Sequence, residues 1–349
     1  MAGQVPRVRP DGVPTPNMED VARAAGVSLG TVSNVINGRD SVTEANRVKV
    51  ERAIQALGYV RNRAARYLAG GSSNTIGFVL IDLSNSFFLD MARGAEDEAQ
   101  QSGMAVVLAN TNMQPERQGV YLNLFEEEQV GGILIAPLAD SMAQVQTIRA
   151  RGPKIVVLND PTGGSDLCHV LVDNELGSYL AARHLIDSGR RALLFAGGPE
   201  RFGPVRERHR GVQRAVAETN GAVTLEVLAG EELQVPDGRR LGHVIAGRPR
   251  SRRPDGIIAV ADLLAVGILQ SLMAESDIRV PDDLSMVGYD NNRSAWDSIV
   301  PISTVAQPGA EMGAVATQLL LEELRSPGDH QHRRITLEPA LIVRESSQR

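Results

Sequence analysis

Apolar residues near the start of the chain recur every three or four positions, which is the spacing of helices that bury one face. The first such stripe is formed by Met18, Val21, Ala22 and Ala25. Asn17, with an acidic residue three positions later, is typical of a capped helix start, and Gly26 is typical of a helix end. We therefore predict that order begins at Asn17, after a disordered leader over residues 1–16 that holds four prolines and two glycines.

Two more helices are predicted directly after the first. Ser28 is placed to cap a second helix, whose apolar positions include Val32, and which Asn37-Gly38 ends. A third helix is predicted over residues 43–57, with Gly58 as its stop. Two short helices joined by a tight turn and backed by a third form a helix-turn-helix unit, whose second helix enters the major groove of DNA.

The second helix carries the small and polar side chains that we expect at DNA. Hydroxyl groups suit phosphate oxygens, and an asparagine amide can pair with adenine. An isolated serine or asparagine on a helix is, however, often only solvated or capping. The residues predicted to contact DNA from this region are Ser28, Leu29, Gly30, Thr31, Ser33, Asn34 and Asn37.

From residue 75 the pattern changes to apolar strands that alternate with helices. Strands are predicted over 75–81, 104–109, 131–137 and 154–158, and then over 191–197, 224–228, 256–261 and 284–289. Helices are predicted between them, among others over 87–101, 206–220 and 263–274. The fold class is therefore an all-α headpiece followed by an α/β core of two doubly wound parallel sheets, with a ligand cleft at the carboxyl ends of the strands. Arg93-Gly94 and Arg210-Gly211 hold equivalent places in the two halves, which indicates duplication.

Charge and composition support this division. Residues 1–70 hold ten Lys and Arg against six Asp and Glu, and the other 279 hold 26 against 36, so the front is basic and the body acidic. A basic module on an acidic carrier suits nucleic-acid binding, although a balance of this size is common on ordinary surfaces. Cys168 is the only cysteine, no apolar run approaches the ~20 residues that span a bilayer, and no export signal is visible, so we expect a cytoplasmic protein without membrane contact.

Two segments carry a resemblance to a known family. Residues 18–38 (MEDVARAAGVSLGTVSNVING) and 58–70 (GYVRNRAARYLAG) resemble the lactose-repressor (LacI/GalR) family of transcriptional regulators. The resemblance implies a homodimer, with a tetramer left open, that binds palindromic double-stranded operator DNA and most often acts as a repressor. It also implies a hinge helix that forms on the operator, with Asn62 as its cap, Arg63 at phosphates and Leu68 wedged into the minor groove. Leu68 could instead be a buried linker residue, but the flexible Gly70-Gly71-Ser72-Ser73 that follows favours the wedge.

The chain from residue 74 on resembles the periplasmic sugar-binding proteins, as the core of this family does. This resemblance implies a small-molecule effector in the cleft between two lobes. Phe87 and Phe88 match the aromatics that stack on a sugar, and we expect one in the cleft and one buried. Arg208 matches an arginine that forks onto ligand oxygens, although a surface arginine is the alternative. Asp290, at the end of a strand, would accept from sugar hydroxyls, and Gln307 would lie at the cleft floor.

Departures from the family pattern limit what can be read about specificity. Gly30 and Asn34 replace larger and basic residues of relatives, so guanine readout there is in doubt. In the cleft, Asn159-Asp160 stands where Asp-Arg is common, and Ala261-Asp262 where Asn-Asp is common. Asn159 and Asp160 stay among the predicted effector residues. The effector could be a sugar, a deoxysugar, a glycoside or a non-sugar, and it could release the protein from DNA or recruit it.

The predicted domains are a headpiece over residues 17–62, a hinge helix and linker over 63–73, and an effector-binding and dimerisation core over 74–349. Within the core we place one lobe at about 74–171 and 304–333 and the other at about 172–303 and 334–346.

Two other function classes were weighed against this prediction. An enzyme is disfavoured because no phosphate loop or nucleophile elbow occurs and the six histidines are scattered; His330 and His332 lie close together, but in a polar stretch typical of an exposed loop. We accordingly predict no cofactor and no metal ion. A solute-binding protein for transport shares the two-lobed body, but it needs an export signal and has no use for residues 17–70.

Overall fold

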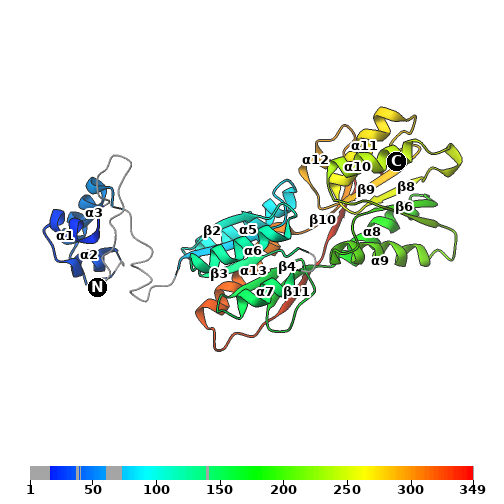
Figure 1. Cartoon of the computed structure of the whole chain (residues 1–349). Coiled ribbons are helices and arrows are strands. Elements are labelled where there is room, and N and C mark those ends of the chain that lie inside the picture. The colour runs from blue at the N-terminus through cyan, green and yellow to red at the C-terminus, as the bar shows by residue number, and fades with distance from the viewer. Residues whose placement is uncertain (1–15, 37–38, 40, 60–72, 139–140, 349) are drawn as a thin grey trace. The chain divides into compact units, whose positions relative to one another are not determined.

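The structure is a computed structural model that describes residues 16–36, 39, 41–59, 73–138 and 141–348 (Figure 1). Within it the chain divides into two compact units, Met1–Ser72 and Ser73–Arg349. The first unit is helical and the second combines helices with sheets. Among the described residues, no helix is both long enough and apolar enough to cross a bilayer.

The described residues of the smaller unit form three helices: α1 (Met18–Ala25), α2 (Leu29–Ile36) and α3 (Glu44–Leu57). Their apolar faces meet in one small core, formed by Val21, Ala22, Ala25, Val32, Val50 and Ala53. The capping box predicted at Asn17 is present, because its side chain accepts from the Asp20 amide and its own amide donates to the Asp20 carboxylate. Gly26 and Gly58 both end helices in the left-handed conformation, which glycine adopts without steric cost.

The larger unit consists of two lobes, each built on a six-stranded sheet. Lobe 1 has the strand order β11-β5-β4-β3-β1-β2. Its elements are β1 (Thr75–Leu80), α5 (Ser86–Gln101), β2 (Ala105–Asn110), α6 (Pro115–Glu127), β3 (Gly132–Ile135), α7 (Met142–Arg149), β4 (Ile155–Leu158), β5 (Cys168–Val172), α13 (Gly309–Arg325) and β11 (Arg334–Leu337).

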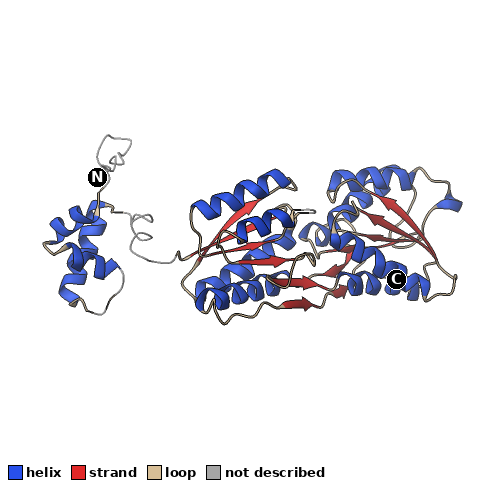
Figure 2. Ribbon diagram, turned by 60° about the horizontal axis from the view of Figure 1, so that its bottom comes forward, coloured by secondary structure: helices blue, strands red, loops and turns tan. Residues whose placement is uncertain are grey.

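Lobe 2 repeats the arrangement with the order β12-β10-β9-β8-β6-β7. Its elements are α8 (Asn174–Asp187), β6 (Ala192–Gly197), α9 (Gly203–Ala217), β7 (Thr224–Ala229), α10 (Val235–Ala246), η1 (Arg250–Arg252), β8 (Gly256–Ala259), α11 (Asp262–Glu275), β9 (Ser285–Tyr289), α12 (Arg293–Trp296), β10 (Ser303–Ala306) and β12 (Ala340–Ile342). The described strand pairs are parallel except for β10 with β12. Helices cover both faces of each sheet (Figure 2), which is why the central strands are apolar along their whole length.

The glycines of the predicted internal repeat occupy equivalent contacts. A Cβ atom on Gly94 of α5 would lie 1.8 Å from the Ala310 carbonyl oxygen of α13, and one on Gly211 of α9 would lie 2.1 Å from the Glu175 carbonyl oxygen of α8. Each glycine therefore lets the first helix of its half pack directly against a neighbouring helix backbone.

The sheet topology moves two of the predicted lobe boundaries. β10 pairs with β9 in lobe 2, so the crossing to lobe 1 follows residue 306 instead of preceding 304. β11 pairs with β5 in lobe 1, so the final crossing follows residue 337 instead of 333. Short apolar strands of this kind do not reveal from their sequence which sheet they join, and both boundaries rest on pairing between distant segments.

Candidate functional site

A cavity of about 400 Å³ lies between the two lobes of the larger unit. The loops after β1 and β4 line it from lobe 1, and α9 and the end of β9 line it from lobe 2. The carboxyl ends of parallel strands converge here, which is the usual place for ligands in such sheets. The seven residues that the sequence indicated for an effector all line this cavity: Phe87, Phe88, Asn159, Asp160, Arg208, Asp290 and Gln307.

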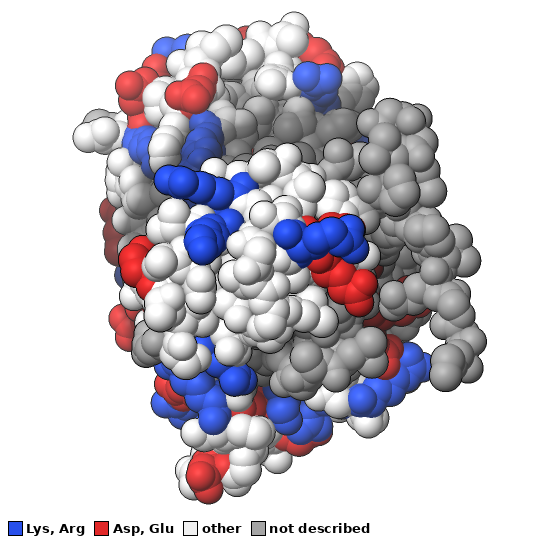
Figure 3. Space-filling model, turned by 90° about the vertical axis from the view of Figure 1, so that its left-hand side faces the viewer, with Lys and Arg blue, Asp and Glu red and all other residues white. Residues whose placement is uncertain are grey.

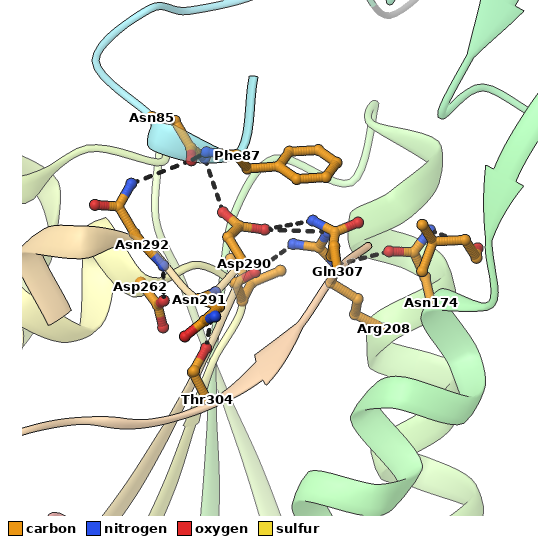
Figure 4. Close-up of polar contacts among 12 residues, drawn as sticks. Asn85, Phe87, Asn174, Arg208, Asp262, Asp290, Asn291, Asn292, Thr304 and Gln307 are labelled. Atoms are coloured by element: carbon orange, nitrogen blue, oxygen red, sulfur yellow. Dashed lines mark hydrogen bonds and ion pairs between the residues drawn. The ribbon is translucent and has the colours of Figure 1, made fainter. Parts of the chain in front are cut away.

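Asp290 lies at the bottom of the cavity, one residue beyond β9. Its side chain is 5% exposed and accepts two amide hydrogen bonds, one from Asn85 Nδ2 at 2.8 Å and one from Gln307 Nε2 at 2.6 Å (Figure 4). Its backbone φ of 103° departs from the strand conformation and is strained for a residue with a Cβ. Burial raises the pKa of Asp290, and the nearby Arg208 guanidinium opposes that shift.

Arg208 reaches the same place from α9 and is not a surface arginine. Its Nε donates to Asn174 Oδ1 at 3.0 Å, its Nη1 donates to the Val260 carbonyl at 2.6 Å, and its Nη2 lies 3.6 Å from Asp290 Oδ1. The guanidinium also stacks 3.6 Å from the centre of the Tyr289 ring. A buried, aligned guanidinium beside a carboxylate can donate to one face of a ligand while the carboxylate accepts from it.

Phe87 and Phe88 do not divide their roles as predicted. Both are buried, both belong to the apolar core of lobe 1, and both line the cavity, with ring centres 5.3 Å apart and planes tilted by 54°. The expectation of one in the cleft and one in the core is therefore wrong. Because α5 begins at the rim of the cleft, consecutive residues of its first turn are each partly core and partly wall.

Asn85 is the main cavity residue that sequence reasoning missed. It caps α5 through the Phe87 amide, donates to Asp290, and its Oδ1 accepts from Asn292 Nδ2 at 3.1 Å. Asn85 belongs to lobe 1 and both partners to lobe 2, so this side chain joins the lobes at the cavity (Figure 4). The sequence offered one signal for this role: Asn85 stands just before a predicted helix and two residues before the aromatic pair Phe87-Phe88.

Further hydrogen bonds join the lobes near the cavity. Gln234 of lobe 2 donates from Nε2 to Asp82 Oδ2 of lobe 1, and both residues line the cavity. The contacts between the lobes thus include side chains that face the space a ligand would occupy, beside the Arg293–Asp90 ion pair, whose residues do not line the cavity.

The two residue pairs that depart from the family pattern, Asn159-Asp160 and Ala261-Asp262, lie in different places. Asn159 has a φ of 55° and a buried Oδ1 without a hydrogen bond in the described chain, while Asp160 Oδ1 accepts from the Thr162 amide at 2.6 Å. Asp262 lies behind the cavity wall, where its Oδ2 accepts from the Asn292 amide at 2.6 Å. Its complete burial, and then repulsion by Asp290, raise the pKa of Asp262 well above its usual value.

In the smaller unit, α2 presents the predicted DNA-contacting residues Leu29, Gly30, Thr31, Ser33 and Asn34 in exposed or half-buried positions. Ser28 precedes the helix and caps it, accepting from the Thr31 amide at 3.1 Å, while the two hydroxyls lie 2.9 Å apart. The predicted residues Asn37, Asn62, Arg63 and Leu68 lie outside the described residues. On the face drawn in Figure 3, Lys and Arg side chains are scattered among other residues and form no single continuous patch.

Comparison with known proteins accounts for this combination of units. Residues 17–62 match the model of bacterial regulatory proteins of the lacI family, and residues 182–347 match a periplasmic binding protein-like domain. The HTH-type transcriptional repressor PurR of Aliivibrio fischeri (strain MJ11) is 30% identical over 331 residues, which cover 94% of this chain and 97% of the relative. The chain belongs to the LacI family. The resemblance identified from residues 18–38 and 58–70 is therefore confirmed.

Other LacI-family relatives extend over the same length. The ribose operon repressor of Haemophilus influenzae is 31% identical over 329 residues, covering 94% of this chain and 98% of the relative. Among solved structures, a transcriptional regulator CelR-cellobiose complex superposes with a TM-score of 0.70 at 30% identity, covering 95% of this chain and 99% of the other. These relatives are transcriptional regulators and not enzymes, in agreement with the predicted function class.

Proposed function

We propose that this LacI-family protein is a transcriptional repressor that binds operator DNA through α2 and is controlled by a small carbohydrate in the cavity between its lobes. The observation that carries the proposal is the cluster of the buried Asp290, Arg208 and Gln307 with the half-buried Asn85, which sets donors and acceptors around one cavity and draws them from both lobes. A protein with this role would work in the bacterial cytoplasm, where the operator lies.

A carbohydrate fits the cavity better than an apolar or a strongly charged ligand. Hydroxyl groups both donate and accept, and the cluster offers the Asp290 carboxylate as acceptor, the Arg208 guanidinium as donor and the Gln307 amide as both. Phe87, Phe88 and further apolar residues form walls against which the C–H face of a sugar ring packs. The cellobiose complex of the CelR relative supports the same class. A volume of about 400 Å³ is at the small end of ligand sites, which favours a monosaccharide or a small glycoside.

DNA recognition would divide between two segments. Thr31 and Ser33 hydroxyls would bind phosphates while Asn34 reads a base edge in the major groove, with Ser28, Leu29 and Gly30 at the helix start and Asn37 just after it. Asn62, Arg63 and Leu68 would form the hinge helix that enters the minor groove.

A second copy of the chain is the partner that the exposed surface of the larger unit fits. β2 and β7 each form one edge of their sheets. β2 exposes the apolar side chains of Val107 and Leu108 and carries no charged residue, and β7 exposes Val227 beside Glu226. The exposed large apolar residues on these strands, on the helices that follow them and on the neighbouring α11 are Val107, Leu108, Val120, Leu124, Val227, Val244 and Met273. A homodimer would cover both edges and bring two headpieces to a palindromic operator.

Control would come from the difference in effector affinity between two lobe arrangements. A ligand that bridges Asp290 and the loop at Asn85 favours the arrangement that brings these residues together, and the lobe 1 strands that lead toward the headpiece move with it. A differential of about 1–3 kcal/mol would change operator affinity by roughly 5- to 150-fold.

The direct test uses the full-length protein. Genomic fragments are selected for binding, and a panel of sugars, glycosides and nucleosides is screened for thermal stabilisation, because a ligand of the folded state raises its apparent stability. The proposal predicts an enriched palindromic sequence and at least one stabilising carbohydrate that changes affinity for it. Enrichment of no sequence would refute the repressor, and stabilisation by nucleosides alone would refute the carbohydrate.

A further inference from the structure

Cys168, His330 and His332 form a compact cluster on the far side of lobe 1 from the cavity. Cys168 begins β5, and the two histidines lie in the segment between α13 and β11. The Cys168 Sγ atom lies 3.2 Å from His330 Nε2 and 3.7 Å from His332 Nδ1, and the three atoms are all within 4.8 Å of one another. Both histidines are half-buried, so the sequence-based interpretation of this stretch as an exposed loop does not hold for them.

The donor set has the chemistry and the spacing of a zinc site. A thiolate with two imidazoles suits Zn²⁺, which takes tetrahedral sites with sulfur at about 2.3 Å and nitrogen at about 2.0–2.1 Å. Tetrahedral geometry with those bond lengths separates sulfur from nitrogen by about 3.5 Å. The two observed sulfur–nitrogen distances, 3.2 and 3.7 Å, lie on either side of that value.

A fourth group, Glu323 of α13, lies near enough to act electrostatically on Cys168 and His332. Its side chain is 7% exposed, and in the described chain its Oε2 atom accepts no hydrogen bond, while its Oε1 atom lies 3.5 Å from Lys154 Nζ. Burial raises the pKa of the Cys168 thiol, and repulsion from the nearby Glu323 carboxylate adds to the shift. Burial lowers the pKa of His332, and the same carboxylate opposes that shift. A buried carboxylate oxygen without a donor in the described chain contributes negative charge near the cluster, which favours a bound cation there.

Ordinary packing is the alternative explanation. The Cys168 sulfur accepts from the Arg333 amide at 3.4 Å, and the imidazole rings meet edge to face at 5.1 Å, so the cluster has some internal contacts without any ion. An amide that donates to sulfur is equally expected beside a metal-bound thiolate, where outer contacts orient the ligands. Packing also leaves the Glu323 oxygen unexplained.

We propose that Cys168, His330 and His332 bind one Zn²⁺ ion, whose positive charge the nearby Glu323 carboxylate helps to balance. The ion would tie the start of β5 to the segment that connects α13 with β11. The strands of lobe 1 run parallel, so this site lies at their amino ends, where β1 also begins. The cavity lies at their carboxyl ends. The site is therefore separate from the effector cavity and adds a metal dependence that the proposed function does not require.

The test uses the reduced, full-length protein after treatment with a chelator. Co²⁺ is added as a spectroscopic probe, and Zn²⁺ is then added to displace it. We expect one equivalent of Co²⁺ to give the visible bands of a tetrahedral site and a near-ultraviolet thiolate-to-cobalt charge-transfer band. Cys168→Ser should abolish the charge-transfer band, and His332→Ala should weaken Zn²⁺ binding by at least about tenfold.

The matched control is His243→Ala, which removes an exposed histidine of lobe 2 that pairs with Glu275 and should leave metal binding unchanged. Circular dichroism and gel filtration establish that each variant is folded. If Cys168→Ser fails to fold, His332→Ala decides the question, because its side chain is only half-buried. Absence of the charge-transfer band in the unmodified chain, or Zn²⁺ affinity equal in His332→Ala and His243→Ala, would overturn the proposal.

Discussion

Replacement of Asp290 by asparagine tests the effector cavity most sharply, because asparagine keeps the size and hydrogen-bonding capacity of the side chain and removes its charge. Asp290→Ala would leave the Arg208 guanidinium, which is 6% exposed, without its carboxylate. Both substitutions remove that charge, but Asp290→Ala also removes both amide hydrogen bonds to the side chain, so the alanine variant would add a larger folding defect to the binding defect.

Asp290→Asn keeps the shape of the side chain and most of its contacts. Its oxygen can still accept from Asn85, and its new amide can donate to Gln307 Oε1, a buried atom that has no partner in the described chain, once the Gln307 amide turns over. What is lost is the negative charge that faces Arg208 and any ligand hydroxyl.

The expected effect follows from the strength of that contact. A hydrogen bond to a charged group contributes about 1.5–3 kcal/mol, so the carbohydrate found by thermal screening should bind roughly 10- to 150-fold more weakly. Titration calorimetry measures the change, with Asp297→Asn as the control because Asp297 is exposed on the same lobe. Operator affinity without the ligand should stay unchanged. Equal ligand affinity in the two variants would show that Asp290 does not bind the ligand.

Three further predictions concern the hinge, a buried acid and helix packing. Leu68→Ala should weaken operator binding in a fluorescence titration while ligand affinity stays normal, and an equal loss of both would reject the minor-groove wedge. Because the folded chain raises the pKa of Asp262, that group stabilises the fold at acid pH and loses this contribution as the pH rises through the raised value. Asp262→Asn should therefore reduce the fall of unfolding free energy as the pH rises, measured in urea, and parallel curves for the two proteins would contradict the assignment. Gly94→Ala should destabilise the core by about 1–3 kcal/mol, since the new methyl would meet the Ala310 carbonyl. Its control, Gly119→Ala, meets only the Gln144 side chain, at 3.7 Å, and equal urea midpoints for the two would refute the packing argument.

Local signals in the sequence were enough to predict the headpiece. Caps, stops and apolar spacing act within a few residues, and Asn17, Gly26, Ser28 and Gly58 behave in the structure as their positions indicate. The long apolar strands of the core were equally readable. The short strands β11 and β12 could not be predicted in the same way. They have four and three residues respectively, mostly exposed or half-buried, so they show little periodicity and depend on pairing with distant partners.

Only those cavity residues that belong to family motifs could be predicted from the sequence. Family motifs indicated Arg208 and Asp290, but no sequence pattern shows that Asn85 bridges to residues more than two hundred positions away. The Cys168 cluster illustrates the same limit, since its ligands are separated by 162 and 164 positions and only the β5–β11 pairing brings them together. Residue spacing reveals binding sites formed by neighbouring residues, whereas sites formed by residues distant in the sequence appear only in the folded structure.

The central claim is that ligand in the cavity controls affinity for a specific DNA sequence. The most direct measurement is a fluorescence anisotropy titration of the selected duplex and a scrambled duplex at one fixed salt concentration, with and without the stabilising carbohydrate. The account predicts tight binding to the selected duplex alone and a change of roughly 5- to 150-fold in its Kd on addition of the carbohydrate. Equal affinity for both duplexes, or a Kd that the carbohydrate does not alter, would contradict it.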